Sequence, residues 1–331
     1  MLIEVSEPSQ AGDARRKVLA VAESSLMGER RSGAAALAVT EMATNLVKHA
    51  GKGYILIQPL QQNGAAGLRV ISIDKGPGIQ DIARALSDGH STAGSIGGGL
   101  GAIRRASDSF EVYSVPGTGT LVRAEFWEQK RGVAPAAVPI EVGVVSEPIS
   151  GEDVCGDGWG VRFSPDAAMV MVVDGLGHGI LAAEAAREAE RVLAEGRHDS
   201  LTDILLDAHL ALKKTRGAAF GLARIDVTRR LVSFAGVGNI STSIVMPGSS
   251  RSLASHNGIL GQQMERIQEF TVPWEQNSIV VMHSDGLGTR WDLERYPGIW
   301  KKHPSLIAAV LHRDFFRGRD DVTVLVAKAA G

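Results

Sequence analysis

The spacing of hydrophobic residues changes along the first third of the chain. Residues 14–28 and 33–50 place apolar side chains every three or four positions, which predicts two helices. The apolar runs at 53–60 and 67–74 predict strands, and a helix near 99–107 with strands at 110–115 and 120–127 follows. Helices before and between antiparallel strands predict an α/β sandwich with helices covering one face of the sheet.

The rest of the chain is richer in strands. Short β-branched or aromatic segments bounded by turn residues predict strands at 141–148, 158–164, 168–174, 219–227, 231–238, 241–246 and 278–285. Two helices, at 180–195 and 200–214, fall together in the middle, and residues 223–236 predict a hairpin that turns near Thr228–Arg229. Paired sheets with helices outside fit this pattern, so the fold class is α/β (α+β).

A break in periodicity separates the two parts. The segment from Trp127 to Val138 contains charges, then glycine, alanine and proline, as linkers do. A chain of 331 residues also suggests about two domains. We therefore expect one domain at 1–127, a linker at 128–139 and a second domain at 140–331.

Composition excludes several classes of protein. With 44% hydrophobic and 22% charged residues the chain is a folded protein, and its net charge of −2 provides no broad attraction to nucleic acid or anionic membrane. The single cysteine, Cys155, excludes an intramolecular disulfide framework. The start of the sequence is unlike a signal peptide, and no apolar stretch approaches the ~20 residues that span a bilayer. We expect a cytoplasmic protein without nucleic-acid or membrane partners.

The predicted helix at 33–50 carries a pair of polar residues that could face a cleft. Glu41 and Asn45 are four residues apart, which places carboxylate and carboxamide on one helical face, with Lys48 one turn further on. A solvated polar face would have the same pattern. The stripe expected to anchor the helix to the sheet consists of Leu37, Met42, Leu46 and Val47.

Three glycine-containing segments follow in the first domain. Asp74-Lys-Gly76-Pro-Gly78 ends a predicted strand, where glycines allow close approach of a flat ligand and the carboxylate can accept a hydrogen bond from an amino group. A plain turn would look the same. A glycine-rich run opens the next helix and can present N–H groups to phosphates; it consists of Gly97, Gly98, Gly99, Leu100 and Gly101. The last segment, 117–120, ends in Thr120.

In this order, E-x-x-x-N, D-x-G-x-G, the glycine-rich helix start and G-x-G-T resemble the sequence boxes of the GHKL (Bergerat-type) ATPase superfamily. The segments EMATNLVKHAGKG and DKGPGI are most similar to the small anti-sigma and switch serine kinases of bacterial stress signalling.

This resemblance implies a role for each matched residue of the first domain. Asn45 holds Mg²⁺ between the phosphates of ATP, and Asp74 binds the adenine amino group. Gly76, Gly78 and the 97–101 run line the nucleotide, with Thr120 near the base. Glu41 is the general base that takes a proton from a substrate hydroxyl.

Aspartates recur beside glycines near strand ends in the second domain. They are Asp157, Asp174, Asp285 and the pair Asp320-Asp321. Each Asp-Gly pair alone would be read as a turn, but a buried carboxylate requires a partner or a metal. Several carboxylates converging at strand ends form the oxygen-rich environment that Mg²⁺ or Mn²⁺ prefers.

These segments resemble metal-dependent phosphatases of the PP2C superfamily, in the bacterial stress and sporulation (SpoIIE-like) branch, through CGDG, DGLGHG, RGAAFGLARID, GVGNI and DDVTVLV. The expected fold is an α-β-β-α sandwich. By this resemblance Asp174 bridges two Mn²⁺ or Mg²⁺ ions, with the Gly175 carbonyl on one of them. Asp285 and Asp320 hold the second ion, Asp157 supports the first, and a water between the ions attacks phosphoserine or phosphothreonine.

Two positions depart from the superfamily pattern, and one histidine has two interpretations. Gly156 stands where many members have an acidic residue before the first aspartate. Of the adjacent pair we assign Asp320, because the superfamily usually places its ligand first. His178 is a candidate to protonate the leaving oxygen. The alternative interpretation is a loop histidine without a catalytic role.

The resulting hypothesis is a bifunctional regulator of a partner-switching pathway. The first domain phosphorylates a Ser or Thr of a STAS-type antagonist or related switch protein, and the second removes a phosphate. In one alternative, the first domain binds ATP and sequesters a sigma factor or another switch protein without kinase activity. In another, it is a nucleotide sensor that gates the phosphatase. The presence of Glu41 favours kinase activity.

Overall fold

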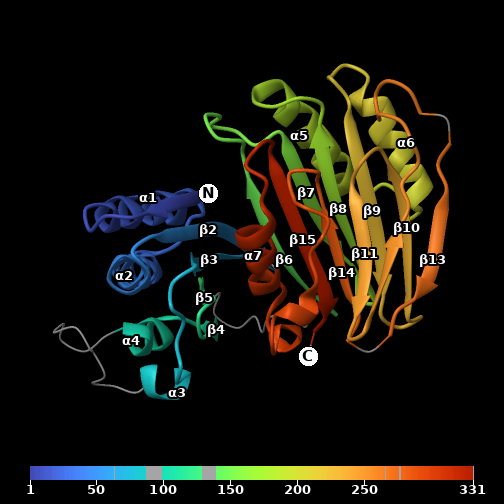
Figure 1. The fold of residues 1–331 in the computed structure, drawn as a ribbon. Coiled ribbons are helices and arrows are strands. Elements are labelled where there is room, and N and C mark those ends of the chain that lie inside the picture. Colours follow the sequence, from blue (N-terminus) through green and yellow to red (C-terminus); the bar gives the residue numbers. More distant parts are fainter. Residues whose placement is uncertain (63, 87–98, 129–138, 265, 276, 331) are drawn as a thin grey trace. The chain divides into compact units, whose positions relative to one another are not determined.

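The chain divides into two compact units (Figure 1). The computed structural model describes residues 1–62, 64–86, 99–128, 139–264, 266–275 and 277–330. The first unit comprises Met1–Ala137 with Tyr296–Lys302, and the second comprises Val138–Arg295 with His303–Gly331. Of the expected linker 128–139, only Glu128 and Pro139 are described. Over the described ranges, none of the helices has the length and apolar character needed to cross a membrane.

The first unit contains one five-stranded antiparallel sheet in the order β1-β2-β3-β5-β4. Its strands are β1 (Leu2–Val5), β2 (Gly53–Gln62), β3 (Ala65–Asp74), β4 (Ser109–Val115) and β5 (Gly119–Trp127). Its helices are α1 (Gln10–Ser24), α2 (Glu29–Asn45), the π-helical turn η1 (Leu46–Ala50), α3 (Ile82–Ala85) and α4 (Gly99–Ala106). One hydrophobic cluster joins α1, α2 and α4 to a single face of the sheet, which confirms the predicted α/β sandwich.

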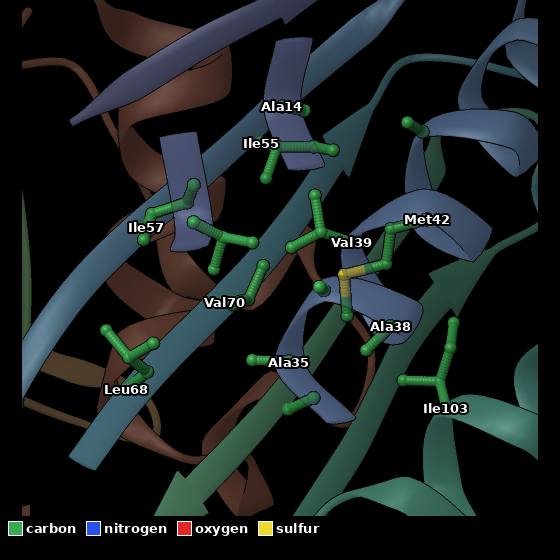
Figure 2. Packing of buried hydrophobic residues seen from close by; sticks show 14 of the residues in the cluster. Ala14, Ala35, Ala38, Val39, Met42, Ile55, Ile57, Leu68, Val70 and Ile103 are labelled. Atoms are coloured by element: carbon green, nitrogen blue, oxygen red, sulfur yellow. The ribbon is translucent and has the colours of Figure 1, made fainter. Parts of the chain in front are cut away.

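The packing of α2 corrects one expectation about its buried face. Ala35, Ala38 and Val39 are fully buried, and Figure 2 shows them with Met42 on the side of the helix that faces the strands. Leu37, which the sequence pattern placed in the anchoring stripe, is 50% exposed. Small alanine side chains let the helix lie close to the sheet, so a search for large apolar residues selected the wrong position.

The second unit contains two five-stranded sheets, in the orders β13-β10-β9-β8-β7 and β12-β11-β14-β15-β6. The strands of the first sheet are β7 (Asp157–Phe163), β8 (Ala167–Gly175), β9 (Ala218–Asp226), β10 (Leu231–Val237) and β13 (Glu269–Pro273). Those of the second are β6 (Ile140–Glu147), β11 (Ser241–Met246), β12 (Ser249–Leu253), β14 (Ile279–His283) and β15 (Val322–Ala329).

Helices cover the outer faces of these two sheets. The helices are α5 (Ile180–Glu195), α6 (Leu201–Leu212) and α7 (Pro304–Phe315), and the unit also contains the short 3-10 turn η2 (Leu293–Arg295). A second 3-10 turn, η3 (Ile299–Lys301), lies in the Tyr296–Lys302 stretch that belongs to the first unit. One hydrophobic cluster fills the space between the sheets, and a second joins the first sheet to α5 and α6. Helix α7 packs on β6 and β15 of the second sheet (Figure 1). This arrangement is the predicted α-β-β-α sandwich.

Some elements had no signal in the sequence pattern. The missed strands and helices are β1, β12, β13, α3, η2, η3 and α7. Every residue of α7 from Pro304 to His312 is buried, so this part of the helix has no solvent-exposed face. By contrast, the amphipathic α5 has the bounds that its pattern predicted, and the β9–β10 hairpin turns at 227–230 as expected.

Candidate functional site

Glu41 and Asn45 lie in the last turn of α2, outside its buried stripe. Both residues are half-buried, whereas Met42 and Ala43 between them are buried. The α-helix ends at Asn45 and continues as the π-helical turn η1, instead of running regularly to residue 50. Such wider turns are frequent at functional sites. The end of this turn packs against the Asp74–Gly78 segment: a Cβ added to Gly76 would lie only 2.8 Å from the Cβ of Ala50.

The Asp74 carboxylate ties two loops of this unit together. Its Oδ1 accepts hydrogen bonds from the backbone N–H of Gly76 at 2.8 Å and of Thr120 at 3.0 Å. The Gly117 N–H also donates to the Pro77 carbonyl at 2.7 Å. The structure therefore brings Asp74, Gly76 and Thr120 together, although 46 residues separate Asp74 from Thr120.

Two glycines allow these loops to approach each other. Gly78 and Gly119 have φ values of +72° and +101°, a backbone conformation that residues other than glycine rarely adopt. A Cβ on Gly78 would collide with the Val115 carbonyl, and one on Gly119 would collide with the Asp74 carbonyl. Sequence reasoning singled out Gly78 for ligand contact, and the structure adds this close backbone approach as a second reason for glycine.

Ser114 connects the same loops and was not found from the sequence. Its Oγ accepts a hydrogen bond from the Ile79 N–H at 2.8 Å and lies 2.8 Å from the Thr120 Oγ1. An isolated serine in a strand has no sequence signal for such a role.

The glycine-rich run lies only partly within the described residues. Gly97 and Gly98 are outside them, and Gly99, Leu100 and Gly101 form the first turn of α4. The Leu100 side chain belongs to the hydrophobic cluster of the unit, which anchors the helix start to the core.

In the second unit, strand pairing brings two of the predicted aspartates together. Asp157 begins β7 and lies opposite Asp174 near the end of the neighbouring strand β8. Asp285 follows β14, and Asp320 precedes β15, which is the strand paired with β14. The four aspartates thus come from the ends of strands in both sheets.

Electrostatics shows that three of these carboxylates influence one another. The pKa of Asp174 is raised to about 7 by burial and by the negative charges of Asp285 and Asp320. Burial and the charge of Asp320 also raise the pKa of Asp285. Within the described residues, no three histidine, cysteine or acidic side chains are arranged to hold a metal ion as they stand.

Asn239 lies between two of these carboxylates and was not selected from the sequence. Its Nδ2 donates a hydrogen bond to Asp285 Oδ2 at 2.9 Å, and its side chain also hydrogen-bonds Asp174, which lowers the pKa of that carboxyl. Asn239 belongs to the GVGNI segment just before β11, whose resemblance to the superfamily was the one available signal.

Of the four aspartates Asp157, Asp174, Asp285 and Asp320, Asp157 is the most deeply buried. It is 7% exposed, and its Oδ2 accepts a hydrogen bond from the Ser284 Oγ at 2.6 Å. The Ser284 Oγ in turn accepts from the Thr323 N–H at 2.9 Å. Burial and the charge of Asp174 raise the pKa of Asp157 well above its ordinary value. Ser284 and Thr323, which the sequence did not single out, therefore link this carboxylate to β14 and β15.

The adjacent residues Asp320 and Asp321 differ in burial and in hydrogen bonding. Asp321 is 3% exposed, and its two oxygens accept hydrogen bonds from the Ile149 N–H at 2.8 Å and the Gly156 N–H at 2.9 Å. Asp320 is exposed. Both oxygens of the Asp321 carboxylate therefore already accept hydrogen bonds from the backbone before Asp157. One of the two donors is Gly156, the position at which many superfamily members have an acidic residue.

His178 is paired with an acidic residue that sequence reasoning did not find. Its Nδ1 lies 2.7 Å from Glu152 Oε1, and the imidazole is 59% exposed. Glu152 also lies beside Gly179, so that the loop before β7 contacts the loop after β8. A carboxylate on Nδ1 orients the ring and leaves Nε2 for solvent or substrate.

The two units have the folds of a GHKL-type α/β sandwich and a PP2C-type α-β-β-α sandwich. The model of the histidine kinase-like ATPase domain matches residues 5–126, and the model of the Stage II sporulation protein E (SpoIIE) family matches residues 164–330. The chain belongs to the SpoIIE family, and its first unit is a histidine kinase-like ATPase domain.

Similar proteins include a kinase and a phosphatase. Serine/threonine-protein kinase RsbT of Bacillus subtilis (strain 168) is 43% identical over 90 residues, which cover 27% of this chain and 68% of RsbT. Phosphoserine phosphatase RsbX of the same organism is 26% identical over 138 residues, which cover 41% of this chain and 69% of RsbX. A crystal structure of RsbX in complex with magnesium has the same fold, with a TM-score of 0.51 and 21% identity over 67% of this chain and all of that one.

Proposed function

We propose that the chain is a bifunctional regulator of a partner-switching pathway. Its second unit hydrolyses phosphoserine or phosphothreonine on a protein, and its first unit binds ATP and phosphorylates a Ser or Thr of a STAS-type antagonist or related switch protein. The domains are taken as 1–127 and 140–331, joined by a linker at 128–139. The observation that carries the proposal is the group of mutually repelling carboxylates at the strand ends of the SpoIIE-family unit.

The acidic cluster fits divalent cations by its chemistry. Carboxylate oxygens are the ligands that Mg²⁺ and Mn²⁺ prefer, and positive charge would relieve the repulsion that raises the pKa of Asp174. The proposed ligands of two ions are Asp157, Asp174, the Gly175 carbonyl, Asp285 and Asp320. Assigning Asp320 in preference to Asp321 is supported by the two backbone hydrogen bonds that already occupy Asp321. The relative RsbX was crystallised with magnesium.

Bound ions would supply charge neutralisation and an activated water, while the chain positions the groups around them. Asn239 holds Asp285 and Asp174 in a fixed orientation through its amide. Ser284 does the same for Asp157. His178, with Nδ1 against Glu152, donates a proton from Nε2 to the leaving serine or threonine oxygen.

In the first unit, the proposed nucleotide site lies between the end of α2 and the two tied loops. Asp74 accepts a hydrogen bond from the adenine amino group, with Thr120 near the base. Asn45 holds Mg²⁺ against the phosphates, and the nucleotide is lined by Gly76, Gly78, Gly97, Gly98, Gly99, Leu100 and Gly101. Glu41, one helical turn before Asn45, removes the proton of the incoming hydroxyl. Support comes from the 43% identity with the kinase RsbT in this unit.

The phosphatase proposal is tested with the full-length chain after removal of metal by a chelator. We expect hydrolysis of a phosphoserine peptide to be absent without metal and restored by Mn²⁺ or Mg²⁺, with two ions bound in a calorimetric titration. Hydrolysis that is unaffected by chelation, or a titration that shows no metal binding, contradicts the dinuclear site.

A further inference from the structure

The loop between α6 and β9 holds an arginine beside the predicted metal site. The Leu176 N–H donates to the Gly217 carbonyl at 3.0 Å, which joins this loop to the segment that follows Asp174. The Gly217 N–H donates to Thr215 Oγ1 at 3.0 Å, and Gln262 Nε2 donates to the Arg216 carbonyl at 2.5 Å. Hydrogen bonds on both sides therefore fix the backbone that carries Arg216.

The Arg216 guanidinium lies over the loop after Asp174. A Cβ added to Gly177 would be 2.9 Å from Arg216 Nη1. The residue is exposed, and among the described residues it has no acidic partner in a salt bridge. Some other arginines of the unit are paired, such as Arg162 with Asp199 and Arg313 with Asp314. Within the described part of the chain, Arg216 is thus a cation without an acidic partner, and it lies over Gly177, three residues after the proposed metal ligand Asp174.

Formal charge indicates what this cation would bind, if the phosphatase function proposed above holds. Asp157, Asp174, Asp285 and Asp320 carry four negative charges, which two divalent ions neutralise. The phosphoryl group of a phosphoserine or phosphothreonine adds about two negative charges that the ions then leave uncompensated. A guanidinium can neutralise one of them with two parallel hydrogen bonds to non-bridging oxygens.

We propose that Arg216 binds the phosphoryl group of the substrate. It is a substrate-binding residue of the phosphatase site. Because it contacts the phosphoryl group itself, its contribution to binding is the same for every substrate protein. This role deepens the proposed phosphatase function by assigning the residue that selects the dianionic group.

The test compares Arg216→Ala and Arg216→Lys with Arg229→Ala in the full-length chain loaded with Mn²⁺. Arg229 is a matched control because it is an exposed arginine of the same unit at the β9–β10 turn, the end of β9 remote from Ala218. Three quantities are measured: the KM for p-nitrophenyl phosphate, the KM for a phosphoserine peptide with acidic flanks, and the dissociation constant of inorganic phosphate by calorimetry.

We expect Arg216→Ala to raise all three quantities by about 10- to 100-fold, as for loss of a hydrogen-bonded charge. The lysine variant should recover part of the loss, and Arg229→Ala should match the wild type. Unchanged phosphate binding in Arg216→Ala overturns the proposal. A rise confined to the acidic peptide also overturns it, since Arg216 would then recognise carboxylates of the substrate. Absence of hydrolysis by the wild type contradicts the phosphatase function itself, and the phosphate titration alone then decides the role of Arg216.

Discussion

Asp74 in the first unit and Asp174 in the second both follow apolar strands, yet their surroundings are opposite. Backbone N–H groups surround Asp74, with Gly76 and Thr120 donating to one oxygen. Asp174 is half-buried among carboxylates, and desolvation together with the charges of Asp285 and Asp320 raises its pKa to about 7. The first site is organised by hydrogen bonds within the chain, whereas the second holds charge that a cation would balance. Two strand-end aspartates with glycines close behind them, Asp74 in Asp-Lys-Gly and Asp174 in Asp-Gly, are therefore expected to respond in opposite ways to neutralisation.

The largest difference is expected for Asp174→Asn. We expect phosphatase turnover to fall by more than about 10³-fold, because the carboxylate proposed to bridge both ions is lost. The same change should stabilise the metal-free protein by about 2 kcal/mol, since it removes a buried charge that its neighbours repel. Asp166→Asn, at the opposite end of the β7–β8 pair, is the control. Activity is measured with Mn²⁺, and stability by urea unfolding with chelator.

For Asp174→Asn, near-normal turnover would contradict the bridging role. A variant that loses activity and is also less stable without metal would contradict the repulsion inferred from the pKa.

Glu41→Ala should have the next largest effect. We expect phosphorylation of a STAS-type partner to fall at least 10²-fold while ATP remains bound, because a general base contacts the incoming hydroxyl and not the nucleotide. The assay uses labelled ATP in an Asp174→Asn background, so that the phosphatase does not remove the product. Glu29→Ala, an exposed acidic residue in the first turn of the same helix, is the control.

Retention of the full phosphorylation rate in Glu41→Ala would leave Glu41 with a structural role only. If the Asp174→Asn parent binds a STAS-type partner but transfers no phosphate to it, sequestration replaces the kinase function.

Asp74→Asn tests the other side of the comparison. We expect a loss of about 10- to 100-fold in ATP affinity, because the amide would present a donor where the adenine amino group requires an acceptor. Stability should stay unchanged, since the amide oxygen can still accept from Gly76 and Thr120. Calorimetric titration with ATP and Mg²⁺ measures this, with Glu23→Gln on the exposed face of α1 as control. Unaltered affinity would remove Asp74 from the nucleotide site.

The sequence predicted both folds because their elements have clear periods. The strand-end position of Asp174 and Asp285 follows from the apolar runs before them, so the acidic cluster could be anticipated. Sequence could not separate Asp320 from Asp321, because the difference depends on the backbone of Ile149 and Gly156, more than 160 residues away. The whole of α7 was missed, and its residues from Pro304 to His312 are buried without the exposed polar face that marks a surface helix.

Single polar residues that support a site were also missed in the sequence. Ser114, Asn239 and Ser284 each act through one to three hydrogen bonds to a predicted residue or its loop. Their partners are distant in sequence, and neither their type nor their spacing distinguishes them from surface residues.

The smallest effect is expected for Asn239→Ala, which keeps every proposed metal ligand. The amide donates to Asp285 at 2.9 Å and also bonds Asp174, so its loss frees two carboxylates to change orientation. Loss of such an outer partner typically costs 10–100-fold in metal affinity or activity, and we expect about tenfold here because the strands still place both aspartates. Asn257→Ala, an exposed asparagine of the same unit, is the control. The metal concentration that gives half-maximal activity should rise, and excess Mn²⁺ should restore most of the rate. A lower rate that excess metal does not restore would show that Asn239 contacts the substrate or the attacking water. The difference between the two units would then include a direct role of Asn239 in the reaction, beyond the different surroundings of Asp74 and Asp174.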